Sequence, residues 1–544
     1  MKRLCGAGMG LMFLLSLSIA AYADYKDDIG YTMLQIELGI DLPDGSGVPV
    51  TQTEALSGGS WMPDPTDPQF SRKTMTYHTG ETPGIYSQHA TSVGKRFFGN
   101  TLSIAPGIST IDCYSADYWM RSDFIRTGYP GKPLYSASRV ANHSWIGYTD
   151  DADEDSEILR RLDWVIETDE FIQSVGLSNG STNRPLLGSA FNVISAGCTD
   201  GEHGTGSAPV DDSMGDDVYL PERTRPDIVV PLGYTSSTAP VTAAASALLV
   251  EAGHSDPGLS TDPEVLSTRN RNGDVIYNAE RSEVIKAVLM AGADRYIIND
   301  SGSAITSYRA DPANQTANGL DKRFGAGQLN IYNSYYVLSA GEQNSIEDDP
   351  PSQGAIDPDG FDYDPSFGGS GGGNDKASYY FTADSRSLIL SVSLVWNLYI
   401  DGGPSDDSFN GSATLHDLNL FLNDVTDPGD PLLVARSESI AENTENLRML
   451  LENGHDYEIQ VTPANGSSPF EWDYALAWHT FFLESDLDGD GDVGGIDLAA
   501  FSDAFGSSVG EPNYNPDADF DGNDAVDVGD LATFASSFGR TDYP

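Results

Sequence analysis

The alternation of short apolar segments with helical stretches between residues 30 and 341 is the feature that most constrains the fold. Helices are expected at 155–167, 237–252 and 281–293, and the last of these has apolar residues at the spacing of one helix face. Those apolar residues are Val284, Ile285, Val288 and Leu289. A chain that alternates strands with helices predicts a parallel sheet covered by helices. We therefore place residues 24–345 in one α/β domain.

The composition changes after this domain. Residues 346–376 are rich in Asp, Pro, Gly and Ser, contain too few apolar residues for a core, and are expected to form a linker. Residues 377–483 contain segments in which every second residue is apolar, such as 388–396 and 457–461. Such segments, separated by turn residues, predict a β-sandwich domain.

The first 23 residues have the pattern of a secretory signal peptide. Lys2 and Arg3 precede an apolar run from Leu11 to Ala20, and Ala21-Tyr22-Ala23 offers the small residues that signal peptidase accepts. The run is too short to cross a bilayer, and no later segment reaches the roughly 18 apolar residues of a membrane span. The mature protein is therefore expected to begin at Asp24, to be secreted, and not to reside in a membrane.

The net charge is strongly negative. The chain has 29 Lys and Arg against 82 Asp and Glu, a formal charge of −53. Nucleic acids and anionic membranes bind through Lys and Arg that displace counterions, so neither is expected as a partner. Cys5 belongs to the signal peptide. The other two cysteines, Cys113 and Cys198, either pair in an oxidising compartment or remain buried free thiols.

Four segments of the α/β domain carry residue types that nucleophilic catalysis uses. A glycine-rich turn leads into a strand that ends at Glu54, and His89 opens an expected helix. Asn179 follows an apolar strand, and Ser236 precedes a helix of small residues. With the turn at Phe324–Asn330, these segments resemble the subtilisin family of serine peptidases. The order acid, histidine, serine along the chain is the order in that family.

The resemblance implies a subtilisin-like serine endopeptidase with a triad of Glu54, His89 and Ser236. His89 would accept the proton of the Ser236 hydroxyl, and Glu54 would fix the tautomer of the imidazole. Asn179 would donate to the oxyanion of the tetrahedral intermediate. An extended peptide substrate would pair with the segment Asn142–Gly147, which resembles the substrate-binding strand of the family.

Each of these residues also has a simpler interpretation. Ser236 could be a helix N-cap, and Asn179 could be a turn residue before a glycine. His89 could be an ordinary core or surface histidine. Asp41 or Asp44 could supply the acid instead of the glutamate, although both precede the glycine-rich turn.

The chain also departs from the family pattern. Glu54 replaces an aspartate, Ser92 and Val241 replace histidines, and Tyr234 replaces a glycine before Thr-Ser. Gln52 is more polar than a residue should be in a strand covered on both faces. These departures favour, as the alternative function, a catalytically inactive subtilisin-like protein that binds peptides or acts as a scaffold.

Residues 484–544 contain two copies of an acidic loop followed by a stretch with apolar residues at helical spacing. Oxygen ligands at loop positions 1, 3, 5 and 12, with a backbone carbonyl at position 7, wrap a calcium ion. The expected ligands are Asp486, Asp488, Asp490, Asp492 and Asp497 in the first loop, and Asp519, Asp521, Asn523, Ala525 and Asp530 in the second. The apolar residues that follow the loops are Leu498, Phe501 and Phe505, and then Leu531, Phe534 and Phe538.

This duplicated loop and helix resembles type I dockerin modules, which implies two bound Ca²⁺ ions and a cohesin-like protein partner. A solvated acidic tail would lack the periodic Leu and Phe residues. Asp524 stands where the first loop has Gly491, so the second site is expected to bind calcium more weakly.

The sequence therefore predicts a secreted serine endopeptidase that is attached to a partner through a calcium-binding dockerin. Besides the inactive scaffold, a third possibility is a structural subunit of a dockerin-assembled complex, in which the α/β domain is only a spacer.

Overall fold

The computed structural model describes residues 24–539, apart from 79–83, 150, 181–185, 209, 211–213, 217, 296–304, 348–353, 369–373, 385–387 and 467. The expected signal peptide at 1–23 and the last residues of the predicted dockerin, 540–544, lie outside the described residues. Within the described ranges, no helix is long and apolar enough to cross a membrane.

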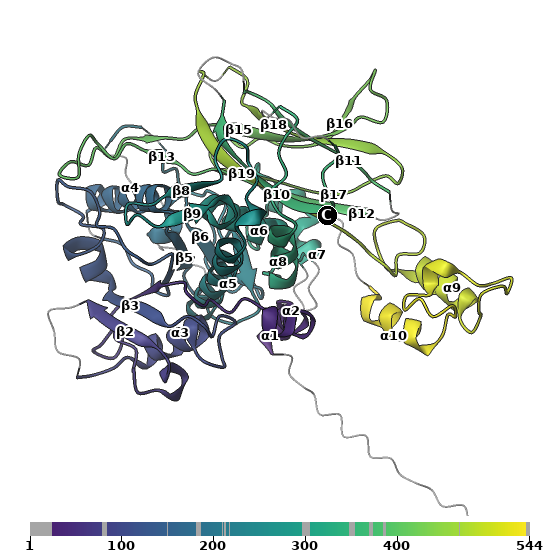
Figure 1. Ribbon diagram of the computed structural model, residues 1–544, viewed down its shortest axis with the longest axis horizontal. Coiled ribbons are helices and arrows are strands. Elements are labelled where there is room, and N and C mark those ends of the chain that lie inside the picture. The colour runs from purple at the N-terminus through teal and green to yellow at the C-terminus, as the bar shows by residue number, and fades with distance from the viewer. Residues whose placement is uncertain are drawn as a thin grey trace, which may run out of the picture.

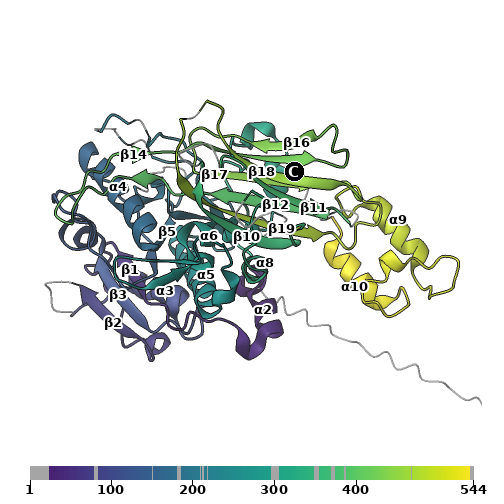
Figure 2. The same ribbon diagram turned by 45° about the horizontal axis from the view of Figure 1, so that its top comes forward.

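A seven-stranded parallel sheet forms the centre of the α/β part, with the spatial order β2-β3-β1-β4-β5-β6-β7 (Figures 1 and 2). The strands are β1 (Val50–Glu54), β2 (Thr74–His78), β3 (Thr110–Ser115), β4 (Val140–His143), β5 (Ile172–Gly176), β6 (Ile194–Cys198) and β7 (Ile228–Val230). Every neighbouring pair is parallel, so the carboxyl ends of all these strands lie at one edge. The predicted parallel sheet is confirmed.

Helices cover the sheet, as the sequence predicted. They are α1 (Tyr25–Asp28), α2 (Tyr31–Leu38), α3 (Gln88–Phe98), α4 (Ala152–Asp169), α5 (Thr235–Ser255), α6 (Ser282–Ala291), α7 (Ile305–Arg309) and α8 (Ile331–Ser339). Helix α5 packs on β4, β5 and β6, and it also contacts α3 and α8. Its small residues allow this close packing, because Ala243, Ala244 and Ala247 are fully buried.

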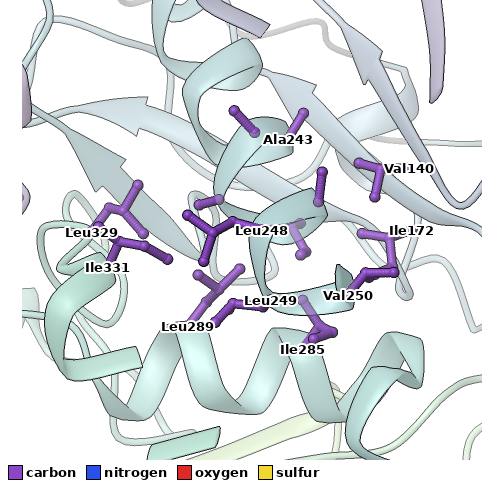
Figure 3. Close-up of a cluster of buried hydrophobic side chains, with 14 of the residues drawn as sticks. Val140, Ile172, Ala243, Leu248, Leu249, Val250, Ile285, Leu289, Leu329 and Ile331 are labelled. Carbon is purple, nitrogen blue, oxygen red and sulfur yellow. The ribbon is translucent and has the colours of Figure 1, made fainter. Parts of the chain in front are cut away.

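Figure 3 shows the main core, where Leu248 and Leu249 of α5 meet Ile285 and Leu289 of α6. Each fully buried side chain of this kind contributes about 1.5–3 kcal/mol relative to an exposed one. Cys113 and Cys198 are also buried in the α/β part, and both are free thiols.

The predicted β-sandwich is also present. One antiparallel sheet has the order β10-β19-β12-β17 and the other β11-β18-β15-β16. Their bounds are β10 (Asp359–Phe367), β11 (Ala377–Thr382), β12 (Leu388–Val395), β15 (Leu418–Asp424), β16 (Leu432–Ser437), β17 (Thr444–Leu450), β18 (Asp456–Pro463) and β19 (Trp472–Phe482). Fully buried Trp396, Trp478 and Tyr379 fill the space between the two sheets.

The prediction that residues 346–376 form a linker is wrong for the stretch that becomes strand β10. β10 pairs along its length with β19, for example Gly360 with Trp478. Aspartates alternate with the aromatic residues of this strand, which hid its pattern, yet Asp362 is buried and accepts a 2.5 Å hydrogen bond from Tyr379. The sandwich therefore begins inside the expected linker.

The sandwich shares its core with the α/β part. Phe361 and Tyr363 of β10 belong to the same buried cluster as α6 and α8, and Arg281 lies 4.1 Å from the Tyr363 ring centre. Carboxylates are buried at this interface. Glu283 is 1% exposed and its Oε1 has no hydrogen-bond partner among the described residues, while Tyr363 donates to Asp473 at 2.6 Å. Burial of the carboxyl group raises the pKa of Glu283 well above its usual range, and the nearby negative charges of Glu170 and Asp473 raise it further.

The C-terminal residues form a small module of two loops and two helices, α9 (Gly495–Ala504) and α10 (Val528–Ser537), drawn in yellow in Figure 1. Phe501 and Phe534 stack at its centre with ring centres 4.8 Å apart. Ile389 and Leu483 of the sandwich belong to the same cluster, so the module packs on the end of the sandwich. The other predicted apolar positions, Leu498, Phe505, Leu531 and Phe538, remain 40–46% exposed.

Candidate functional site

Glu54 is the last residue of β1, and its side chain is buried at the carboxyl edge of the sheet. Its Oε2 atom lies 3.0 Å from Nδ1 of His89, the second residue of helix α3. Ser87 caps this helix by accepting a 3.2 Å hydrogen bond from the N–H of Ala90, which fixes the position of the first turn. The His89 side chain is 37% exposed, so it is open to solvent beside its buried partner. The structure thus brings Glu54 and His89 together.

The other possible acids are not placed to do this. The backbone N–H groups of Asp44 and Gly45 each donate to Glu251 at 2.6 Å, near the C-terminal end of α5. Ser236 lies at the other end of that helix, roughly 20 Å away at 1.5 Å per residue. No hydrogen bond or ion pair joins Asp41 to the histidine among the residues described. The geometry therefore leaves Glu54 as the partner of the histidine.

Ser236 is the second residue of α5, half-buried at the positive end of the helix dipole. The N–H groups around it are occupied: that of Thr235 donates to Asn179 at 2.9 Å, and those of Ser237 and Thr238 donate to the carbonyl of Tyr234. The N–H of Ser236 is left without a partner in the described part of the chain. Its backbone can therefore donate to a bound anion.

Asn179 lies just beyond the end of β5, and its side chain is oriented by Thr235. Its Oδ1 accepts from both the N–H of Thr235, at 2.9 Å, and the Thr235 hydroxyl, at 3.1 Å. Its backbone forms an antiparallel bridge with His203. Because Oδ1 already accepts two hydrogen bonds, the Nδ2 group of Asn179 is the part of the side chain that can donate to a ligand. The bonds to Thr235 hold Asn179 beside Ser236.

His89 and Ser236 stand on the contacting helices α3 and α5. No hydrogen bond joins them among the described residues. In unliganded catalytic sites such bonds are often long and shorten when substrate binds. The structure therefore assembles two pairs, Glu54 with His89 and Asn179 with the start of α5, on neighbouring elements at one edge of the sheet.

The electrostatics of the first pair favour a charged histidine. The hydrogen bond with Glu54 raises the pKa of His89 above its usual value, although burial of the ring opposes this. Burial raises the pKa of Glu54, and the hydrogen bonds that it accepts from His89 and Gln52 oppose this rise. A carboxylate that stabilises imidazolium suits the histidine for accepting a proton from a hydroxyl group.

A cavity of about 410 Å³ opens beside this site, where the chain leaves β1, β3 and β4. The predicted substrate-binding segment forms one wall through Trp145, Ile146 and Gly147. Leu56, Trp61, Tyr118 and Met120 add apolar surface, and Asp117 and Arg121 add charge. None of these last six residues was predicted, because two follow β1 and four lie in or beside the helical turn Tyr118–Ser122 after β3, and only the strand order brings these segments together.

The two C-terminal loops gather carboxylates in the way that calcium ligands require. Ligand oxygens of Asp486, Asp488 and Asp497 all lie within 4.8 Å of one another, and those of Asp519, Asp521 and Asp530 do so in the second loop. Burial and the neighbouring Asp497 and Asp490 raise the pKa of Asp488, as expected when like charges are held together. This donor set fits a hard divalent cation.

The remaining predicted ligands do not belong to these carboxylate groups. Asp490 and Asn523 accept backbone N–H bonds from Asp492 and Ala525, which are the residues at loop position 7. Asp524 has φ of 68°, the left-handed conformation that favours glycine, where the first loop has Gly491 with φ of 88°.

The sequence matches no protein-family model and no curated protein. Solved structures that are similar to it include the self-cleaved protease domain of PatA, with 15% identity and a TM-score of 0.33 over 55% of this chain and 99% of that one. The prenylagaramide maturation protease PagA is 15% identical, with a TM-score of 0.31 over 53% and 93%. A cold-adapted subtilisin-like serine proteinase is also 15% identical, with a TM-score of 0.25 over 38% and 77%.

Proposed function

We propose that the α/β part is a subtilisin-like serine endopeptidase that hydrolyses peptide bonds outside the cytoplasm. The observation that carries the proposal is the 3.0 Å bond between buried Glu54 and accessible His89 at the sheet edge, next to the helix that Ser236 opens. The other groups that acyl transfer needs are the half-buried serine, the oriented Asn179 amide and the Ser236 N–H, which has no partner within the described ranges.

In this mechanism Ser236 Oγ attacks the carbonyl carbon of the peptide bond while Nε2 of His89 takes its proton. Glu54 holds Nδ1 of the ring and stabilises the imidazolium. Negative charge then develops on the former carbonyl oxygen, where Asn179 Nδ2 and the Ser236 N–H donate. His89 returns the proton to the leaving amine, and the acyl-enzyme is hydrolysed by water that the same histidine activates.

The substrate would be an extended peptide lying along the segment 142–147. The cavity lined by Trp145, Trp61 and Tyr118 would receive one of its side chains. Backbone pairing contributes affinity in such complexes, and the pocket contributes selectivity.

We further propose that residues 484–544 bind two calcium ions and dock to a cohesin-like protein, as in type I dockerins. The paired carboxylate groups support the calcium sites. Leu498 and Leu531 occupy equivalent places after the two loops, as do Phe505 and Phe538, and their partial exposure offers apolar surface for a protein partner.

Covalent labelling tests the peptidase proposal. A fluorophosphonate probe should phosphonylate Ser236 alone, because only an activated hydroxyl reacts readily. Peptide mapping by mass spectrometry would locate the label in the parent and in Ser236→Ala and His89→Ala, which should remain unlabelled. Ser237→Ala, one residue further along the same helix, is the matched control and should label like the parent. A folded parent that neither takes the probe nor cleaves unfolded proteins would favour the inactive peptide-binding scaffold.

A further inference from the structure

Gln52 is a buried amide in the middle of the central sheet. It lies on β1 two residues before Glu54, and side chains two apart on a strand point to the same face. The strand is flanked by β3 on one side and β4 on the other, and the Gln52 side chain is only 1% exposed. Its Nε2 has two hydrogen-bond acceptors, whereas its Oε1 is buried without a hydrogen-bond partner among the described residues, and an unsatisfied buried oxygen destabilises the sheet.

The amide nitrogen of Gln52 bridges Glu54 and helix α3, which carries His89. Nε2 donates to Oε1 of Glu54 at 3.0 Å and to the carbonyl of Ala90 at 2.8 Å. Glu54 therefore has one carboxylate oxygen fixed by Gln52 and the other facing His89. Ala90 follows His89 in α3, so the second bond ties the helix to the strand.

The orientation of the amide follows from its neighbours. The backbone carbonyl of Ala90 can only accept a hydrogen bond, so the Gln52 nitrogen, not its oxygen, must face it. The Gln52 oxygen points toward α3, where a Cβ atom on Gly94 would lie only 2.9 Å from it. Glycine in a helix interior costs about 1 kcal/mol relative to alanine, and at Gly94 it leaves room for the amide.

We propose that Gln52 is a positioning residue for the catalytic pair. A glutamate has one more rotatable bond than an aspartate, so its carboxylate needs an additional anchor to present a fixed oxygen to the histidine. Gln52 provides that anchor and holds helix α3 at the same time. This inference rests on the proposed peptidase function. It gives a positioning role to Gln52, which is more polar than expected for a strand covered on both faces.

The test compares Gln52→Met with the parent. Methionine has a similar volume but no donor, so the loss of a bond to a charged group should lower kcat about 10- to 100-fold with little change in KM. The pKa of His89 should fall, because an unanchored carboxylate holds the imidazolium less well. Thr53→Val is the matched control: it alters the neighbouring buried residue on the opposite face and should keep the parent kcat.

A double variant separates positioning from a general packing defect. In Glu54→Gln, the Gln52 donor forces the new amide oxygen toward itself and the NH₂ group toward His89. Adding Gln52→Met frees that amide to turn, so the double variant should be at least as fast as Glu54→Gln alone. A double variant that is slower by the full Gln52→Met factor would overturn the inference and make Gln52 a packing residue.

The role of Gln52 can be decided even if the parent is inactive. The chain has eight histidines, and ¹³C-labelled histidine allows the titration of His89 to be followed by NMR, assigned with His89→Ala. A parent that takes no fluorophosphonate refutes the peptidase, whereas an unchanged His89 titration in Gln52→Met refutes the anchor. A labelled parent with unchanged kcat in Gln52→Met refutes only the anchor.

Discussion

Replacing Glu54 with glutamine should remove most of the activity without unfolding the protein. Glu54 Oε2 accepts from His89 Nδ1, and Oε1 accepts from Gln52. In Glu54→Gln the fixed Gln52 donor selects the amide oxygen, which leaves an NH₂ group facing Nδ1. The histidine must then carry its proton on Nε2, so it cannot accept the proton of Ser236.

The expected loss is about 10³- to 10⁴-fold in kcat, or about 4–5.5 kcal/mol of transition-state stabilisation. Stability should be kept or slightly increased, because burial disfavours the charged carboxylate that the variant removes. Steady-state hydrolysis of an unfolded protein substrate and a thermal melt of each variant measure both effects. A Glu54→Gln enzyme within tenfold of the parent kcat, with His89→Ala inactive, would refute this role for the acid.

Three further predictions concern other parts of the molecule. Asn179→Ala removes an oxyanion donor, so it should lower kcat about 10²- to 10³-fold with little change in KM in the same hydrolysis assay. An unchanged kcat would place the oxyanion elsewhere. Asp488→Ala removes a carboxylate from the first loop, so it should weaken calcium binding to the full chain by about tenfold or more in calorimetric titration. Unaltered binding would argue against this loop as a calcium site. The free energy of unfolding should fall as pH rises from about 4.5 toward the raised pKa of Glu283, because the folded state holds a proton that the unfolded chain releases. Glu283→Gln should flatten that pH dependence in urea titrations, and an equally steep profile in the variant would show that another group controls it.

Local patterns were sufficient to predict the layers of the fold. The helix at 281–293 was visible because its apolar residues recur on one face, and α6 occupies most of that range. Strand order was not predictable, since it depends on which distant segments pack together. For the same reason Trp61 and Tyr118 could not be connected with the segment 145–147 before the structure placed them around one cavity.

The wrong linker prediction at β10 and the unexpected polarity of β1 have a common physical cause. Asp362 in β10 and Gln52 in β1 are polar, and a pattern based on hydropathy treats such residues as evidence against a buried strand. In the folded chain each has a specific partner, Tyr379 for Asp362 and Glu54 with Ala90 for Gln52. The cost of burying the Asp362 carboxylate and the Gln52 amide nitrogen is offset by hydrogen bonds to residues that are distant in the sequence, although the Gln52 oxygen has no partner among the described residues.

The continuous core between the α/β part and the sandwich limits how this protein could be divided or recombined. A fragment ending at residue 345 would lose Phe361 and Tyr363 and expose the faces of α6 and α8 that these side chains cover. We expect such a fragment to aggregate, so a transferable enzyme would have to include the sandwich and end near Leu483. We therefore expect the predicted linker, residues 346–376, to lie inside the smallest unit of this chain that folds alone.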